Sequence, residues 1–227
     1  MAEAPAATFV FADLAGYTAL TAAHGDEHAA DTAAAFVSEV RQLLADYEAE
    51  AIKSIGDALL IRAQDADQAV HLAARIMEDL GGRDRSLGIR IGMHTGTAVR
   101  RGDDWFGVGV NIAARIADLA ESGEILMSDE TRHAARRAVR PDQLQSLGRR
   151  ELKHVHEPVE IHVLHPAGDS GRQLPIDPVC HMALEPTRCE ARRVHRGVEY
   201  RFCSTTCAAA FDRSADRYVG RPASGRR

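Results

Sequence analysis

The pattern of hydrophobic and polar positions divides residues 1–165 into short strands and helices. A run of apolar residues predicts a buried strand over 8–12, and apolar residues spaced three and four apart predict a helix over 28–48. Gly56-Asp57 separates two strand-like runs and is typical of a hairpin turn. Because hairpins occur among alternating helices and strands, we expect an α+β sandwich with a mixed or antiparallel sheet.

The remaining elements follow the same two patterns. Strands are predicted over residues 51–55, 58–62, 87–94, 97–101 and 124–128, and as a pair within 150–164. Helices are predicted over 66–80, 107–120 and 129–138. Small residues recur in the second of these helices and would allow it to pack closely, namely Ala113, Ala114 and Ala117.

The composition changes after residue 165. Residues 166–175, PAGDSGRQLP, have the composition of a linker, and the segment that follows is short, charged and cysteine-bearing. We therefore predict a domain over 1–165, a linker over 166–175, a small module over 176–219 and a disordered tail over 220–227.

Composition excludes several classes of function. Hydrophobic residues make up 45% of the 227 residues and aromatic residues 5%, so the core should be aliphatic. The net charge of -5 leaves no dominant basic field for nucleic acid. No run reaches the ~20 apolar residues of a membrane helix, and residues 1–8 lack the features of a signal peptide. We expect a soluble, cytoplasmic protein that binds neither nucleic acid nor membrane.

Two aspartates stand at the ends of predicted strands. Asp13 follows FVFA, and Asp57 lies in the hairpin turn. Magnesium prefers one or two carboxylates together with substrate phosphates, and two bound ions could stabilise both the attacking and the leaving oxygens of a phosphoryl transfer. Without their surroundings, however, two ordinary turn aspartates would be the better interpretation.

Four segments change that interpretation. FVFADLAGYTAL, IKSIGDALL, IRIGMHTGTAV and DDWFGVGVNIAARI resemble, in order, the opening strand and metal loop, the second metal hairpin, the central strand and the substrate helix of class III adenylyl cyclases. The resemblance covers residues 8–164. It implies a ferredoxin-like-derived cyclase sandwich that converts ATP to 3′,5′-cyclic AMP and pyrophosphate with two Mg²⁺ or Mn²⁺ ions per site.

The resemblance also assigns roles to single residues. Asp13 and Asp57 match the metal-binding aspartates of the family, and Lys53 and Asp104 match the pair that recognises the purine. A lysine can donate to adenine N1 while a carboxylate accepts from the exocyclic amine, and guanine would require the reverse polarity. The pair therefore favours ATP over GTP, although a shift of one residue would replace Asp104 by Asp103.

A second group of residues matches the family's transition-state machinery. Asn111 and Arg115 lie four residues apart, hence on one helical face, and match the residues that orient the ribose and bond the phosphate. Arginine suits the second role because its donors form a planar fork. Lys153 matches a triphosphate-binding lysine, although His154 stands where a glycine is usual. Residues 47–51, YEAEA, replace the usual His-Gly-Gly turn without removing a catalytic side chain.

The resemblance further implies a homodimer. In the family the two metal-binding aspartates come from one subunit, and the purine and transition-state residues come from the other. All of these positions are filled in this one chain, so a symmetric homodimer would hold two complete sites.

The cysteines form a separate pattern. Cys203 and Cys207 are separated by three residues, and Cys180 stands in DPVCHM. In a reducing compartment such spacing is typical of metal ligands rather than disulfides. The segment resembles the YHS or TRASH type of metal-binding module. That implies zinc as the default ion, or copper or mercury in a sensor. The fourth ligand is left open, with candidates His181, His195 and Cys189; a metal-free fold with buried thiols is the alternative.

Several interpretations remain open at this stage. The leading one is an adenylyl cyclase whose output is tuned by metal or thiol redox state through the C-terminal module. A guanylyl cyclase is opposed by the purine pair. A metal sensor that keeps a silent cyclase domain for dimerisation would lack polar site residues, and none is missing. The histidines at 154, 156, 162 and 165 are interpreted as solvated.

Overall fold

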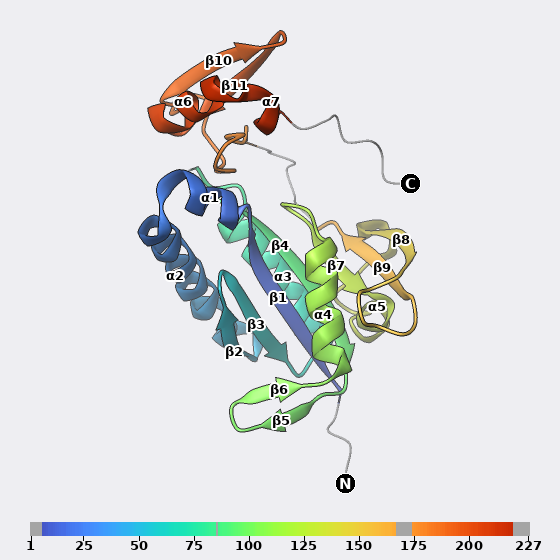
Figure 1. Ribbon diagram of the computed structural model, residues 1–227. Coiled ribbons are helices and arrows are strands. Elements are labelled where there is room, and N and C mark those ends of the chain that lie inside the picture. Colours follow the sequence, from blue (N-terminus) through green and yellow to red (C-terminus); the bar gives the residue numbers. More distant parts are fainter. Residues whose placement is uncertain (1–5, 85, 167–173, 220–227) are drawn as a thin grey trace. The chain divides into compact units, whose positions relative to one another are not determined.

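The computed structural model describes residues 6–84, 86–166 and 174–219 (Figure 1). Most of the predicted linker and the whole predicted tail lie outside the described residues. The chain divides into two compact units: the first is Met1–Ala15, Thr32–Gly81 and Ile89–Gly171, and the second is Gly16–Asp31, Gly82–Gly88 and Arg172–Arg227. The second unit therefore combines two short N-terminal segments with the C-terminal residues.

The first unit is organised around a seven-stranded sheet in the order β2-β3-β1-β4-β7-β9-β8. The parallel pair β4–β7 stands beside the antiparallel pairs β1–β3, β2–β3, β7–β9 and β8–β9, so the sheet is mixed. The predicted α+β class is thus confirmed. The strands are β1 (Ala7–Ala15), β2 (Ala49–Ile55), β3 (Ala58–Ala63), β4 (Gly88–Gly96), β7 (Ile125–Ser128), β8 (Leu144–Arg150) and β9 (Val159–Leu164).

Helices and a small hairpin complete this unit. A two-stranded ribbon, β5 (Val99–Arg101) and β6 (Asp104–Phe106), leads into helix α4. The helices are α2 (Asp26–Leu43), which begins in the second unit, α3 (Ala66–Leu80), α4 (Val108–Leu119) and α5 (Asp129–Ala134), with 3₁₀ turns η1 (Leu44–Tyr47) and η2 (Pro141–Gln143). None of the helices in the described part of the chain is long and apolar enough to cross a membrane.

Strand β1 is buried along almost its whole length because helices contact both of its faces. Phe9 and Phe11 pack with α4 in one core cluster, and α3 also contacts β1 (Figure 1). Small residues let α4 approach the sheet closely, as the sequence predicts. A Cβ placed on Gly92 of β4 would lie 2.1 Å from the backbone nitrogen of Ala117. The glycine is therefore required for the packing of α4.

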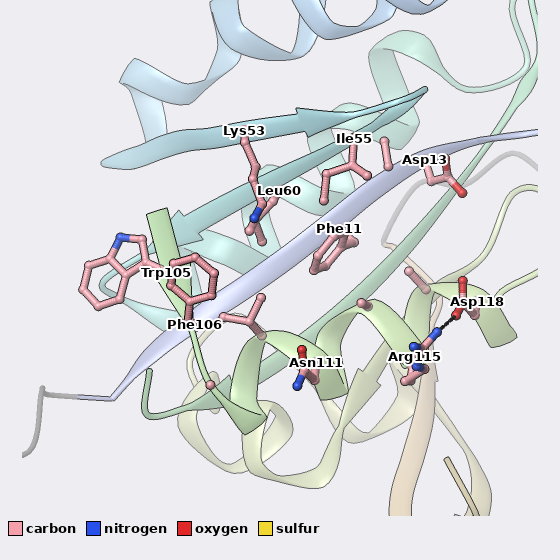
Figure 2. A pocket seen from close by; sticks show the side chains of 15 residues that line it. Phe11, Asp13, Lys53, Ile55, Leu60, Trp105, Phe106, Asn111, Arg115 and Asp118 are labelled. Carbon is pink, nitrogen blue, oxygen red and sulfur yellow. Dashed lines mark hydrogen bonds and ion pairs between the residues drawn. The ribbon is translucent and has the colours of Figure 1, made fainter. Parts of the chain in front are cut away.

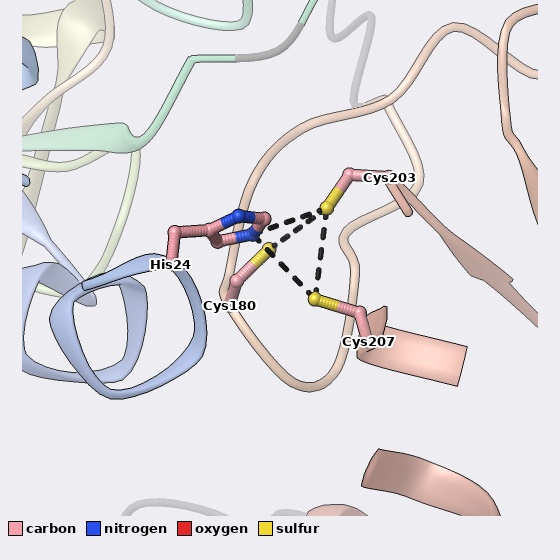
Figure 3. Close-up of side chains that lie close together, drawn as sticks. All are labelled: His24, Cys180, Cys203 and Cys207. Atoms are coloured by element: carbon pink, nitrogen blue, oxygen red, sulfur yellow. Dashed lines mark hydrogen bonds between the residues drawn. The ribbon is translucent and has the colours of Figure 1, made fainter. Parts of the chain in front are cut away.

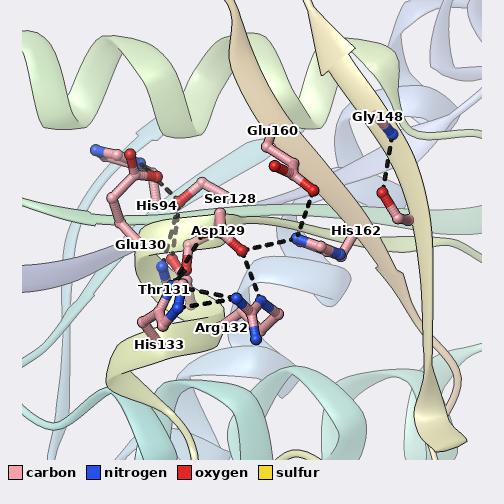
Figure 4. A network of polar contacts seen from close by, with 11 residues as sticks. His94, Ser128, Asp129, Glu130, Thr131, Arg132, His133, Gly148, Glu160 and His162 are labelled. Atoms are coloured by element: carbon pink, nitrogen blue, oxygen red, sulfur yellow. Dashed lines mark hydrogen bonds and ion pairs between the residues drawn. The ribbon is translucent and has the colours of Figure 1, made fainter. Parts of the chain in front are cut away.

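His94 on β4 and His162 on β9 are buried members of a network of polar side chains (Figure 4). His94 bonds the Ser128 hydroxyl at 2.8 Å, and His162 bonds Asp129 at 3.0 Å. Both histidines are only 6% exposed, so the prediction that His162 is solvated was wrong. Asp129 also accepts a 2.6 Å hydrogen bond from Arg132, so its carboxylate is already neutralised within the fold.

The second unit includes helix α1 (Tyr17–His24), which the hydrophobic pattern did not predict. The C-terminal part of this unit contains the hairpin of β10 (Ala191–His195) and β11 (Val198–Phe202). It also contains the helices α6 (Thr205–Arg213) and α7 (Ala215–Tyr218). Phe211 packs against the tilted rings of Tyr200 and Phe202 in this hairpin. The segment at 82–88 joins the unit through a bridge between Leu87 and Met182.

Candidate active site and thiolate cluster

A cavity of about 610 Å³ lies over one face of the sheet in the first unit (Figure 2). Its walls come from strands β1, β2 and β3, the ribbon residues that precede α4, and α4 itself. Four of the residues predicted from the sequence line it: Asp13, Lys53, Asn111 and Arg115. Residues as far apart in the chain as Asp13 and Arg115, 102 positions, thus face one volume.

The two predicted metal-binding aspartates are neighbours. Asp13 lies within β1, which runs two residues beyond it, and Asp57 lies in the β2–β3 turn, where Gly56 adopts a φ of 64°. Burial and the charge of Asp13 raise the pKa of Asp57 to about 6. Two adjacent carboxylates offer only hard oxygen ligands, so the residues present fit Mg²⁺ or Mn²⁺.

Arg90 is the residue that sequence reasoning missed at this site. Its Nε donates to Asp13 Oδ2 at 2.7 Å, and its Nη2 makes a second contact with the same oxygen. It lies on β4, the strand beside β1. The sequence did contain one signal for this residue: Arg90 is a basic residue within the otherwise apolar segment IRIG of a central strand.

Lys53 and Asp104 form an ion pair of 2.6 Å, in which Lys53 Nζ donates to the carboxylate. Asp104 also accepts from the backbone N–H of Trp105 at 2.8 Å. The hydrogen bond from Lys53 holds the pKa of Asp104 below its usual value. Asp103 is fully exposed, with only a 3.8 Å contact to Arg100. The geometry thus brings Asp104, rather than its neighbour, to the lysine.

Asn111 and Arg115 project from one face of α4 into the cavity (Figure 2). The helix starts after Gly107, whose φ is 152°. Arg115 is 39% exposed in its side chain and forms a 2.9 Å ion pair with Asp118, which also lines the cavity. The guanidinium is therefore held at the cavity wall with donors still facing solvent.

Lys153 does not line the cavity. It is exposed in the turn between β8 and β9. The neighbouring His154 has a φ of 65°, a left-handed conformation that glycine adopts without strain and other residues rarely adopt. The turn thus keeps the backbone of a glycine although the sequence departs from it.

The second unit contains a cluster of sulfur atoms (Figure 3). Cys203 Sγ lies 3.4 Å from Cys180 Sγ and 3.7 Å from Cys207 Sγ. All three cysteines are buried. The sequence prediction that these three residues lie together agrees with the geometry, and Cys189 lies elsewhere, 3.3 Å from Nε of Arg192.

The nitrogen beside the three sulfurs belongs to a residue that the sequence did not single out. His24 Nε2 lies 3.4 Å from Cys203 Sγ and 3.5 Å from Cys207 Sγ. The candidates considered for this position lie elsewhere: His195 bonds Asp216 at 3.1 Å, and His181 is exposed with its Cβ against Gly16. His24 was missed because the short helix α1 was not predicted.

The backbone around the cysteines is fixed by one buried carboxylate. Asp177 accepts from the backbone N–H of Val179 and of Cys203, each at 2.8 Å. Cys207 lies in the first turn of α6, where its N–H donates to the capping hydroxyl of Ser204. Hydrogen bonds from the Cys180 and Cys203 thiols lower the pKa of Cys207 to about 4. The cluster therefore favours a thiolate, the form that binds soft metals.

The described architecture is that of a nucleotidyl cyclase catalytic domain joined to a thiolate-bearing module. The family model "Adenylate and Guanylate cyclase catalytic domain" matches residues 1–166, and the model "YHS domain" matches residues 176–222. The chain belongs to the adenylate and guanylate cyclase family.

Curated relatives carry the same domain. An adenylate cyclase of Streptomyces griseus is 32% identical over 117 residues, which are 52% of this chain and 29% of that protein. A pH-sensitive adenylate cyclase of Mycobacterium tuberculosis is 31% identical over 156 residues, which are 68% of this chain and 39% of that protein. The chain thus spans well under half the length of these relatives.

Solved structures agree on the fold. An adenylate cyclase of Trypanosoma brucei in its monomeric state has a TM-score of 0.62 and 25% identity, covering 72% of this chain and 90% of the other. The guanylate cyclase domain of a protein from Catenaria anguillulae in complex with GTP has a TM-score of 0.63 and 23% identity, covering 72% and 98%. The predicted class III cyclase sandwich is confirmed.

Proposed function

We propose that the protein is an adenylate cyclase that converts ATP to 3′,5′-cyclic AMP and pyrophosphate. The observation that carries this proposal is the 2.6 Å Lys53–Asp104 ion pair, whose lysine lines the cavity together with Asn111 and Arg115. The names of the curated relatives support the same activity.

The ion pair is the basis for the choice of ATP. Lys53 Nζ can donate to N1 of adenine, and the Asp104 carboxylate can accept from the 6-amino group. Guanine presents an N–H and a carbonyl at the equivalent positions, so it would meet a donor with a donor and an acceptor with an acceptor. An unpaired polar contact of this kind costs about 1–3 kcal/mol, which disfavours GTP.

The reaction is an intramolecular displacement at the α-phosphorus. The ribose 3′-oxygen forms a bond to phosphorus, the bond to the bridging oxygen of the β-phosphate breaks, and pyrophosphate leaves; the 3′-hydroxyl proton passes to water or to a substrate phosphate. Bound Mg²⁺ or Mn²⁺, two per site, would supply charge neutralisation at the attacking and leaving oxygens. Asp13 and Asp57 would hold these ions, Asn111 would orient the ribose, and Arg115 would donate to the phosphate as its charge redistributes.

The same proposal includes a homodimer. Apolar side chains are exposed around the cavity: Phe106 is 52% exposed, Val108 67% and Ile55 51%. Large apolar groups in one exposed area mark a surface that is covered by a partner. A symmetric dimer would place the carboxylates of one protomer opposite the purine and transition-state residues of the other, and Lys153 would serve the triphosphate there.

The C-terminal module is proposed to regulate this activity in response to a soft metal or to thiol oxidation. The support is a buried cluster of three thiols that carries a low-pKa cysteine within the same chain as the cyclase domain.

The test is nucleotide turnover by the purified protein with ATP or GTP and with Mn²⁺ or Mg²⁺, beside an Asp57→Ala control. Cyclic AMP from the wild type and none from the variant is the expected result. Preferential formation of cyclic GMP would replace the proposal by a guanylate cyclase. No cyclic product with either nucleotide would contradict it and favour a metal sensor with a silent cyclase domain.

A further inference from the structure

The second unit unites residues from both family matches at one point. His24 lies within the segment matched by the cyclase model, and the three clustered cysteines lie within the segment matched by the YHS model. All four belong to the same compact unit, because residues 16–31 group with the C-terminal residues. The cluster is therefore a feature internal to that unit (Figure 3).

The distances within the cluster match the edges of a tetrahedral site. With Zn–S bonds of about 2.3 Å and Zn–N bonds of about 2.0–2.1 Å, a tetrahedron has S···S edges of about 3.8 Å and S···N edges of about 3.6 Å. Two of the three S···S separations are 3.4 and 3.7 Å, and two of the three S···N separations are 3.4 and 3.5 Å. All four ligand atoms lie within 4.8 Å of one another.

We propose that the site binds a soft divalent metal through Cys180, Cys203, Cys207 and His24, and that His24 thereby makes the position of α1 depend on the metal. The donor set of three thiolates and one imidazole is one that zinc occupies in closed, four-coordinate sites. An imidazole from α1 completes the site, so the metal crosslinks α1 to residues more than 150 positions later in the chain.

The crosslinked helix, α1, follows almost directly in the chain on β1, the strand that carries Asp13. Asp13 lies in β1, which ends at Ala15, and α1 begins at Tyr17. Only Gly16 separates the two elements, and it has a φ of 92°. A metal that fixes His24 restricts the chain that leaves the carboxylate strand. An anchored α1 would hold the end of the strand that carries Asp13 in place. On the basis of the proposed cyclase activity, the metal-loaded protein is therefore the more active form.

The first experiment measures the site itself, without reference to turnover. Co²⁺ is bound to the full-length protein, and its d–d and sulfur-to-cobalt charge-transfer bands are recorded for the wild type, His24→Ala and His24→Cys. Loss of a ligand weakens metal binding, so competition with a chelator should show Zn²⁺ affinity at least about 10-fold lower in His24→Ala. His195→Ala is the matched control and should bind as the wild type does.

His24→Cys keeps the test decisive if the alanine variant folds poorly. A fourth thiolate should restore tight binding and intensify the charge-transfer bands, because the site then holds four sulfurs. Wild-type spectra and affinity in both His24 variants would overturn the proposal. Equal losses in His195→Ala and His24→Ala would also overturn it, since the effect would then not be specific to His24.

The second experiment measures the consequence for α1 and for catalysis. Hydrogen exchange of residues 17–24 should slow on Zn²⁺ loading in the wild type and remain unchanged in His24→Ala. With Mg²⁺ or Mn²⁺ saturating, kcat/KM for ATP should fall at least about 5-fold on removal of the soft metal from the wild type, a typical coupling between sites. It should not change on the same treatment of His24→Ala.

The outcomes separate this inference from the proposed function. If no variant turns over ATP, the Co²⁺ spectra and hydrogen exchange still decide whether His24 is a ligand that holds α1. If turnover is normal while zinc loading leaves exchange in α1 unchanged, the cyclase proposal stands and the metal crosslink is rejected.

Discussion

The two candidate metal sites of this chain are built on opposite principles. The carboxylate site opens onto a cavity of about 610 Å³ and offers hard oxygens from Asp13 and Asp57. The thiolate site is closed, with its three sulfurs buried and a nitrogen within reach of two of them. Magnesium relies on substrate phosphates to complete its coordination, whereas structural zinc takes all four ligands from the protein.

That difference explains the electrostatics of each site. Burial and the charge of Asp13 raise the pKa of Asp57, because the negative charge of its carboxylate is unfavourable there. A bound cation would relieve this cost. Arg90 supplies part of that neutralisation in the chain itself. At the thiolate site, hydrogen bonds from the neighbouring thiols lower the pKa of Cys207 to about 4, and hydrogen bonds within the same cluster raise the pKa of Cys180, so one thiolate is stabilised among the three cysteines. The first site is arranged for turnover, and the second for retention.

The largest expected effect separates the two sites directly. Asp57→Asn removes a ligand charge and should lower cyclic AMP formation by about 100- to 1,000-fold, the typical cost of losing a group that stabilises developing charge. Zn²⁺ and Co²⁺ binding at the thiolate cluster should be unchanged. Asp46→Asn, a substitution at an exposed position in η1, is the matched control. Equal activity of the two variants would contradict the assignment of Asp57.

The purine pair can be inverted. In Lys53→Glu combined with Asp104→Asn, an acceptor replaces the donor and an amide can donate to the guanine carbonyl. Two reversed contacts of about 1–3 kcal/mol each should lower the ratio of kcat/KM for ATP to that for GTP by at least about 100-fold. Asp103→Asn should leave the ratio unchanged. A preserved preference for ATP in the double variant would show that these residues do not recognise the base.

The stability of the sheet region should depend on close packing, whereas that of the C-terminal region should depend on metal ligands. Gly92→Ala places a Cβ against the backbone of Ala117, and overpacking of this kind costs about 1–3 kcal/mol. Urea denaturation should show the loss in free energy of unfolding. Because the clash involves backbone atoms, Ala117→Gly should not rescue it; full rescue would disprove the close approach of β4 and α4.

The smallest expected effect is a change in pH dependence. Burial lowers the pKa of His94 below its ordinary value of 6.5, despite the opposing charge of Glu130. The unfolded chain therefore binds the proton more readily, so stability is retained above pH 6.5 and is lost as the pH falls through the lowered pKa. Urea denaturation between about pH 7 and 5 should show a steeper loss for the wild type than for His94→Gln. Exposed His133→Gln should follow the wild type.

Much of this arrangement could be predicted from the sequence, and the failures share a cause. The apolar run of β1 and the Gly56 turn are local signals, so the hairpin was predicted correctly, and the sheet is the mixed one of the two kinds expected, mixed or antiparallel. The positions of Lys53, Asp104, Asn111 and Arg115 followed from four motifs, although their roles remain predictions. His162 was expected in solvent because alternation along a strand does not reveal that Asp129 lies beside it.

Two misses came from tertiary structure alone. Arg90 reaches Asp13 across neighbouring strands, a separation of 77 positions in the chain. Helix α1 has eight residues, too short for its periodicity to stand out, and its partners lie in the C-terminal residues. His24 therefore could not be connected with the cysteines until the chain was folded.

The discontinuity of the second unit sets an order of events during biosynthesis. The contact between His24 and Cys207 spans 183 positions, so α1 leaves the ribosome long before the residues that hold it. Closing such a long loop is a late and entropically costly step. Residues 16–31 therefore cannot make these contacts until the chain has been synthesised as far as Cys207. The strand that carries Asp13 can pair while its continuation is still unanchored, and completion of the last cysteine segment is the event that finishes the N-terminal part of the fold.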